Sequence, residues 1–189
     1  MAQRQKEVLL AYFPKATHKR YTDLIAAFGS LDVAWHAGFG ALREHLPWKT
    51  ELITEFTSWR DALSEDAIFL ELERGHISPT TINDTTYPPL LKEIYDPPFC
   101  LFVRGDISKL SHPIGVVGTR RYSSYGKHVT DDIVTKLAKK HFSIVSGLAL
   151  GIDSIAHETT VKHGGHTVAV LGGGIDDATV YPRAHSGLA

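Results

Sequence analysis

The sequence predicts an α/β protein, in which a Rossmann-like parallel sheet with helices on both faces is preceded by a small all-helical domain. From Pro113 onward, short apolar runs alternate with segments of helical length, and each apolar run ends in glycine. Such alternation implies parallel strands joined by right-handed crossovers. Residues 5–60 instead read as short helices separated by glycine and proline. We therefore expect a helical domain over residues 1–64 and the Rossmann-like domain over residues 65–189.

In the N-terminal domain the apolar pattern predicts a series of short helices. The first turn, Phe13–Arg20, sits where a helix-hairpin-helix module would approach a DNA backbone, but it contains no glycine to allow that approach. A further helix ends at Gly75, and a proline-rich connector leads to Phe99–Val103, which predicts a strand buried on both faces. The expected helices span residues 6–13, 21–28, 31–36, 39–46, 51–63 and 67–75.

The Rossmann-like part is predicted to contain three strands and two helices in strict alternation. Ligands of parallel sheets bind at the carboxyl ends of the strands. A binding site is therefore expected in the turns that follow the three strands. The strands are expected at residues 114–117, 143–146 and 167–171, and the helices at 124–141 and 153–163.

Composition excludes several classes of protein. The 189 residues include 43% hydrophobic residues and a single cysteine, Cys100, so an internal disulfide framework is excluded and a reducing cytoplasm fits best. No apolar run is long enough for a membrane span.

Asp153 and His157 share a helix face but are too few for a metal site, and Asp176 and Asp177 are expected to be solvated acids.

Charge is uneven along a chain whose net charge is −1. Between Arg104 and Lys140 there are eight basic and three acidic residues, which gives this segment a local positive potential. Lys136, Lys139 and Lys140 are expected to solvate a helix face. Arg120 and Arg121 differ, because they follow the first predicted strand directly.

Glycine-rich turns after the three strands predict an anion site. Gly118 ends the first strand, Gly147 and Gly151 flank the second turn, and Gly172 to Gly174 form the third. Because the strands are parallel, the backbone N–H groups of these turns should converge at one edge, where helix N-termini add partial positive charge.

The anion is not a dinucleotide or a P-loop nucleotide. After the first strand the sequence lacks G-x-G-x-x-G, and the second strand ends Val145-Ser146-Gly147 without an acidic residue for a ribose. No G-x-x-x-x-G-K-[ST] loop is present, so no cofactor is expected. Instead, Arg120 and Arg121 are interleaved with Tyr122 and Tyr125, a combination suited to phosphates and unstacked bases. The two tyrosines could alternatively pack beneath the loop.

These motifs, taken in order, closely resemble the DNA-processing protein A (DprA/Smf) family. The resemblance covers roughly residues 65–185. Upstream it includes Tyr87-Pro88-Pro89-Leu90-Leu91 and Leu101-Phe102-Val103-Arg104-Gly105-Asp106. It continues with Val116-Val117-Gly118-Thr119-Arg120, Ser146-Gly147-Leu148-Ala149-Leu150-Gly151-Ile152-Asp153, Ala169-Val170-Leu171-Gly172-Gly173-Gly174 and Tyr181-Pro182-Arg183.

The resemblance implies a cytoplasmic protein that binds single-stranded DNA and helps to load the RecA recombinase during natural transformation, without catalysing a reaction. It implies a homodimer at full length, no membrane association, and phosphate contacts by Arg120 and Arg183. The N-terminal helices would correspond to a sterile-alpha-motif-like or helix-hairpin-helix-like domain. The residues expected to bind DNA are Gly118, Thr119, Arg120, Arg121, Tyr125, Gly126, Ser146, Gly147, Gly151, Gly172, Gly174 and Arg183.

Three departures from the family pattern stand out. Leu150 occupies a position that is often basic, and Ala184-His185 stands where Glu-Asn is common. The chain stops at Ala189, where family members continue, so we expect a fragment that lacks the regions for dimerisation and RecA contact.

The alternative function is a Rossmann-type nucleotide phosphoribohydrolase, but its Pro-Gly-Gly-x-Gly-Thr turn is missing.

Overall fold

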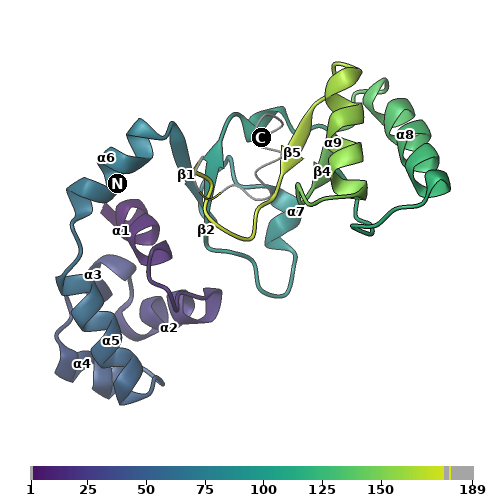
Figure 1. Cartoon of the computed structure of the whole chain (residues 1–189). Helices are drawn as coiled ribbons and strands as arrows, with labels where there is room; N and C mark the ends of the chain where they lie inside the picture. Colours follow the sequence, from purple (N-terminus) through teal and green to yellow (C-terminus); the bar gives the residue numbers. More distant parts are fainter. Residues whose placement is uncertain (1, 177–178, 180–189) are drawn as a thin grey trace. The chain divides into compact units, whose positions relative to one another are not determined.

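Residues 2–176 and 179 are described by the computed structural model, in which the chain divides into two units, residues 1–105 and 106–189 (Figure 1). The boundary expected near residue 65 falls inside the first unit. The reason is that a pair of strands that follows the helices packs against them, so the helical region and this strand pair form one body. The α/β class with an N-terminal helical region is confirmed.

The first unit begins with six helices. Local side chains and a glycine set several of their ends: the Thr17 hydroxyl accepts a hydrogen bond from Arg20 N at 3.2 Å, and Ser30 caps the next helix in the same way. Gly29, with φ of +79°, ends the second helix. The helices are α1 (Ala2–Ala11), α2 (His18–Phe28), α3 (Leu31–His36), α4 (Phe39–His45), α5 (Thr50–Asp61) and α6 (Glu65–Arg74).

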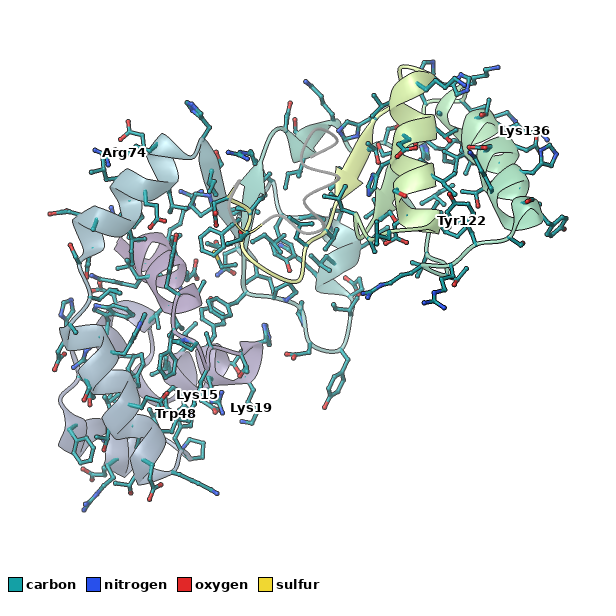
Figure 2. The ribbon with its side chains drawn as sticks, in the orientation of Figure 1. Lys15, Lys19, Trp48, Arg74, Tyr122 and Lys136 are labelled. Atoms are coloured by element: carbon teal, nitrogen blue, oxygen red, sulfur yellow. The ribbon has the colours of Figure 1, made fainter. Side chains whose placement is uncertain are left out.

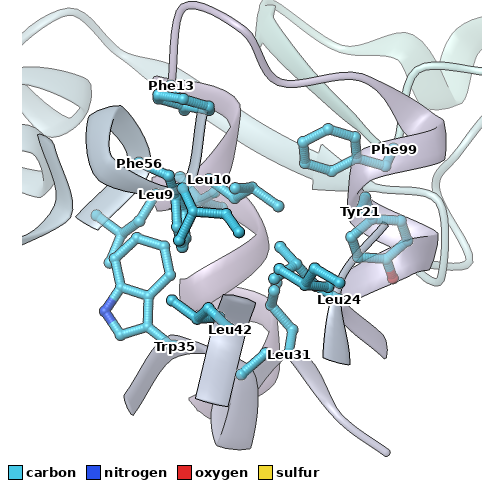
Figure 3. Close-up of a cluster of buried hydrophobic side chains, with 14 of the residues drawn as sticks. Leu9, Leu10, Phe13, Tyr21, Leu24, Leu31, Trp35, Leu42, Phe56 and Phe99 are labelled. Carbon is cyan, nitrogen blue, oxygen red and sulfur yellow. The ribbon is translucent and has the colours of Figure 1, made fainter. Parts of the chain in front are cut away.

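Large aliphatic and aromatic side chains from these helices form the core of the first unit (Figure 3). Phe56 is fully buried and meets Phe13 edge to face, with ring centroids 5.5 Å apart. Tyr21 stacks on Phe99, with centroids 4.8 Å apart, so the segment after the helices shares the helical core. This sharing explains why the unit extends beyond residue 65.

A two-stranded antiparallel sheet completes the first unit. Strand β1 (Ile77–Thr81) pairs with β2 (Cys100–Arg104), and the short helix α7 (Pro89–Lys92) lies between them in the chain. The sequence predicted a connector in place of β1. It also predicted that β2 would be buried on both faces, which is wrong, because its residues are half-buried or exposed; among the residues that the structure describes, β2 pairs with β1 alone.

A buried carboxylate joins the helices to the loop after β1. Glu7 is 2% exposed, and its Oε1 accepts hydrogen bonds from the Tyr21 hydroxyl at 2.6 Å and from Asn83 Nδ2 at 3.0 Å. Burial, followed by the hydrogen bond to Glu7, raises the pKa of Tyr21, so the phenol remains a donor. The network therefore satisfies a charge that would be costly to bury alone.

The described residues of the second unit form a three-stranded sheet in the order β3-β4-β5, and its strands are parallel, as predicted. The helices α8 and α9 pack side by side on one face of the sheet, as right-handed crossovers between neighbouring strands require (Figure 1). Among the residues described for this unit, no helix covers the other face, where one had been expected. The elements are β3 (Ile114–Gly115), α8 (Ser124–Ala138), β4 (Ile144–Ser146), α9 (Ile152–Lys162) and β5 (Thr167–Ala169).

The described part of the chain contains no helix that is both long and apolar enough to cross a membrane.

The buried Glu7 network gives a prediction about stability. The substitution Tyr21→Phe removes one donor to a buried carboxylate, and we expect it to lower the free energy of unfolding of the first unit by about 1–3 kcal/mol. Urea unfolding followed by tryptophan fluorescence measures this, because Trp35, Trp48 and Trp59 all lie in the first unit. The control Tyr125→Phe alters an exposed phenol of the second unit and should leave this transition unchanged; equal transitions for both variants would contradict the prediction.

Candidate functional site

The three glycine turns lie at the same edge of the parallel sheet, as predicted. The pairs Ile114–Ile144 and Ile144–Thr167 are in register, so the chain leaves β3, β4 and β5 on the same side. We call this side, formed by residues 118–126, 147–151 and 172–174, the glycine-turn edge. It also holds the N-terminus of α8, a helix of 15 residues.

The first and second turns pack tightly against each other because two positions are glycine. A Cβ on Gly118 would lie 2.6 Å from Ile152 Cβ, which is closer than carbon atoms approach. A Cβ on Gly151 would lie 2.2 Å from the carbonyl oxygen of Thr119, and Gly151 has φ of +96°. Ile152 N donates to that same carbonyl at 3.2 Å. These glycines thus hold the two turns in direct contact.

A carboxylate of the protein accepts hydrogen bonds from backbone amides of the second turn. Asp153 is 7% exposed, and its Oδ2 accepts hydrogen bonds from Gly147 N at 3.2 Å and Ala149 N at 3.4 Å. These two N–H groups were expected to face a bound anion, but they point to a carboxylate of the protein instead. The Ser146 hydroxyl is also used internally, since it donates to Val116 O at 2.7 Å. These polar groups of the second turn are therefore used within the protein, and the turn packs against the first turn.

The first turn presents two arginines to solvent. Arg120 and Arg121 are both exposed, and neither guanidinium forms a hydrogen bond or ion pair with any residue among 2–176. The backbone that carries them is fixed: Arg121 N donates to Thr119 Oγ1 at 3.1 Å. A rigid turn with two guanidinium groups unused by the protein can bind phosphate oxygens in a forked geometry.

Two exposed aromatic rings flank the arginines. Tyr122 is 44% exposed and Tyr125 is 77% exposed, so Tyr125 does not pack as a core residue. Ser123 caps α8 by accepting from Gly126 N at 3.1 Å, so Tyr122 and Tyr125 lie on either side of the cap residue in the chain; Figure 2 labels Tyr122 on the loop that leads into α8. Flat exposed rings beside cations are what unstacked bases require.

The other candidate groups have structural partners. His157 is buried, with Nδ1 2.7 Å from Thr167 Oγ1, while Asp153 faces the second turn. Asp176 accepts from the Thr179 hydroxyl at 2.8 Å. Among residues 2–176 and 179, no group of three or more potential ligands forms a metal site.

The cysteine of the first unit is not a reactive thiolate. Burial, followed by the charge of Glu7, raises the pKa of Cys100 to about 12, so its thiol stays protonated near neutral pH.

The third turn is open at its first glycine and confined at its last. Gly172 is exposed, and a Cβ on it would meet no heavy atom within 4 Å. Gly174 is also exposed, but a Cβ on it would lie 2.5 Å from Thr179 Oγ1. Asp177 and Arg183 lie outside the described residues. The sequence analysis missed the inward role of Asp153, whose partners are the upstream amides of the second turn.

Comparison with known protein families gives a match over more than half of the chain. A family model described as DNA recombination-mediator protein A matches residues 78–189. The chain is 43% identical over 119 residues to DNA processing protein DprA of Bacillus subtilis, covering 62% of this chain and 39% of the relative. It is 37% identical over 131 residues to protein Smf of Escherichia coli, covering 69% and 34%. The chain thus spans well under half the length of these relatives.

Two solved structures are similar to the chain. The X-ray structure of DNA processing protein A from Streptococcus pneumoniae matches with a TM-score of 0.77 and 26% identity, covering 97% of this chain and 62% of that one. A structure of DNA processing protein A from Helicobacter pylori, a protein with a unique single-stranded DNA binding mode, matches with a TM-score of 0.51 and 29% identity. This second match covers 60% of this chain and 51% of that chain.

The contact between the first two turns gives a second stability prediction. Gly151→Ala adds a Cβ where the Thr119 carbonyl lies and leaves an alanine at positive φ, so we expect a loss of at least about 2 kcal/mol in the second unit. Gly172→Ala is the matched control, because its Cβ would meet open space. Hydrogen exchange of amides in residues 106–176, followed by mass spectrometry, measures the difference; similar protection in the two variants would show that the contact is dispensable.

Proposed function

The chain belongs to the DNA recombination-mediator protein A family, and we propose that it binds single-stranded DNA at the glycine-turn edge of its parallel sheet. The observation that carries this proposal is the first turn. Arg120 and Arg121 are exposed and unpaired within the described residues, and Tyr122 and Tyr125, which follow them closely in the chain, are exposed as well. Cations for the backbone and rings for the bases are the two parts of a single-strand site.

The edge favours a single strand over a duplex. In a duplex the bases are stacked inside the helix, so an exposed ring such as Tyr125 has no free base to contact. In a single strand every base offers a flat face, and stacking on an aromatic ring contributes about 1–3 kcal/mol per base. The Helicobacter pylori protein has a single-stranded DNA binding mode, which supports the same ligand class here.

The site acts by binding, and we propose no catalytic step. The polar groups of the second turn serve the fold: Asp153 is held by two backbone amides and the Ser146 hydroxyl by Val116 O. The groups left to the ligand are guanidinium ions and aromatic rings, which recognise phosphate and bases but do not transfer protons at neutral pH. Holding and orienting a strand is the chemistry that remains.

A role in recombination belongs to the same proposal. The family is described as a recombination mediator, which supports delivery of the bound strand to the RecA recombinase in recombination and natural transformation. A homodimer of the full-length protein and cytoplasmic location are part of this proposal. Arg183, outside the described residues, is proposed as a further phosphate contact.

The arginine contact is tested by salt-dependent binding. We expect Arg120→Ala to weaken binding of fluorescently labelled oligo-dT at least about tenfold, since a charge-assisted hydrogen bond contributes about 1.5–3 kcal/mol. The slope of log affinity against log salt should fall by about 0.7, the value for one phosphate contact on a single strand. Fluorescence anisotropy over a salt series measures both quantities. Arg74→Ala, an exposed arginine at the end of α6 (Figure 2), is the control and should bind normally.

If Arg120→Ala and Arg74→Ala bind oligo-dT equally well, the first turn is not the phosphate site. A preference for duplex over single-stranded DNA in the unaltered chain would overturn the ligand class itself.

The stacking contact is tested separately at Tyr125. Tyr125→Ala should lose about 1–3 kcal/mol of binding free energy for oligo-dT, whereas Tyr125→Phe keeps the ring and should retain the affinity. The salt slope should stay the same in both variants, because no phosphate contact is removed. Equal losses in the Ala and Phe variants would point to the hydroxyl and rule out stacking. Isothermal titration of the three proteins with oligo-dT gives the comparison.

A further inference from the structure

The opposite edge of the parallel sheet gathers the three segments that lead into its strands. Ser143 joins them: Ser111 N donates to the Ser143 hydroxyl at 2.9 Å, and His166 Nδ1 lies 3.0 Å from the same oxygen. The backbone supports the junction, since Ser143 N donates to Ser111 O at 2.8 Å. We call this side, formed by residues 111–113, 139–143 and 162–166, the entry edge.

The ends of α8 and α9 meet at the entry edge. A Cβ on Gly165 would lie 2.9 Å from Ala138 Cβ and 2.9 Å from Thr160 Cγ2, so the chain after α9 passes against the last turn of α8. The lysines at the ends of the two helices are thereby brought to one side of the unit. The His112 ring lies 5.5 Å from the Phe142 ring and adds an aromatic pair to the same side.

The entry edge is strongly basic. Lys139 and Lys140 follow α8 and Lys162 ends α9, all three are exposed, and none forms an ion pair with a residue that the structure describes. Few acidic residues lie near them in the sequence, since residues 133–152 and 159–175 contain no aspartate or glutamate. The four histidines of the edge add rings and hydrogen-bonding nitrogens: His112, His141, His163 and His166.

The acidic groups nearby are already engaged or lie outside the edge. Asp132 pairs with Lys136 at 2.6 Å, and Asp131 accepts from the Thr159 hydroxyl at 2.7 Å. Asp106 pairs with Lys109 at 3.6 Å, and Glu158 lies on α9, one turn before Lys162. The positive charge of Lys139 and Lys140 is therefore left for a partner.

The helix dipoles do not account for all of this charge. The C-terminus of each helix carries about half a negative charge, which a cation in the last turn offsets. Lys162 occupies the last turn of α9 and fills that role there, whereas Lys136, in the last turn of α8, is already paired with Asp132. Lys139, the C-cap of α8, and Lys140 together carry two positive charges against about half a negative charge, so they exceed what the α8 dipole requires.

We propose that the entry edge is a second nucleic-acid-binding surface, which holds the phosphate backbone of a DNA strand independently of the glycine-turn edge. A helix of 15 residues separates the two edges and is about 22 Å long. No single phosphate can contact both. A long strand, or two separate strands, can occupy both edges of one molecule, whereas a short strand can occupy one.

The test compares short and long oligo-dT, of about 4 and about 40 nucleotides, since single-strand sites cover about 4–16 nucleotides and only the short strand is too short to span both edges. In Lys139→Gln/Lys140→Gln we expect the salt slope for the long strand to fall by about 1.4, the value for two phosphate contacts, with the short strand unaffected. The control is Lys49→Gln/Arg74→Gln, which removes the same charge from exposed positions of the first unit. Far-UV circular dichroism checks that the variants remain folded.

Each outcome decides the proposal. A slope for the long strand equal to that of the control would overturn it, and so would equal losses for the short and long strands, which would show that the two edges are not separate. Competition by poly-glutamate as effective as by oligo-dT of equal charge would assign the edge to an acidic protein instead. Because Arg120→Ala reports on the glycine-turn edge with the short strand, its failure would overturn the proposed function and leave this inference standing.

Discussion

The close contact between the first and second glycine turns is the constraint on which the candidate site depends. Gly151 lets the backbone of its turn reach the Thr119 carbonyl, where no side-chain carbon could fit. Ile152 then fills the space above Gly118 and donates its N–H to Thr119 O. The turn that carries Arg120 is therefore held from below by packing and a hydrogen bond. A phosphate can bind to arginines on such a turn without the cost of first ordering the backbone.

Asp153 determines which groups remain free to bind an external phosphate. A glycine turn at the end of a parallel strand commonly offers its amides to an anion. Here the Asp153 carboxylate accepts from Gly147 N and Ala149 N, so the second turn already contains its anion. Recognition of an external phosphate then falls to the guanidinium groups of the first turn and to the N-terminus of α8. This arrangement favours a flexible polyanion over a nucleotide held by a backbone cradle.

The sequence predicted helices in both units and the strands of the second, but not strand β1 of the first, for physical reasons. The strands of the second unit end in glycine and alternate with helices, and these are local signals that survive without knowledge of contacts. Strand β1 carries no such signal, because Ile77–Thr81 contains a proline and polar residues, and it is a strand through its pairing with β2. The extension of the first unit to residue 105 has no local signal either, because the stacking of Tyr21 on Phe99 joins distant parts of the chain. The inward orientation of Asp153 likewise required coordinates.

The two basic edges of the sheet face opposite ends of the helix dipoles, and this sets different requirements for binding an anion. At the glycine-turn edge the positive end of α8 adds to Arg120 and Arg121, so two cations suffice beside the exposed rings. At the entry edge the negative ends of α8 and α9 oppose a phosphate, and attraction begins only after part of the lysine charge has offset them. A surface at the negative ends of two helices therefore needs additional cations before it can bind a polyanion. Lys139 and Lys140 supply them, which is why the salt dependence of binding at the entry edge should follow these two lysines more closely than any one histidine ring.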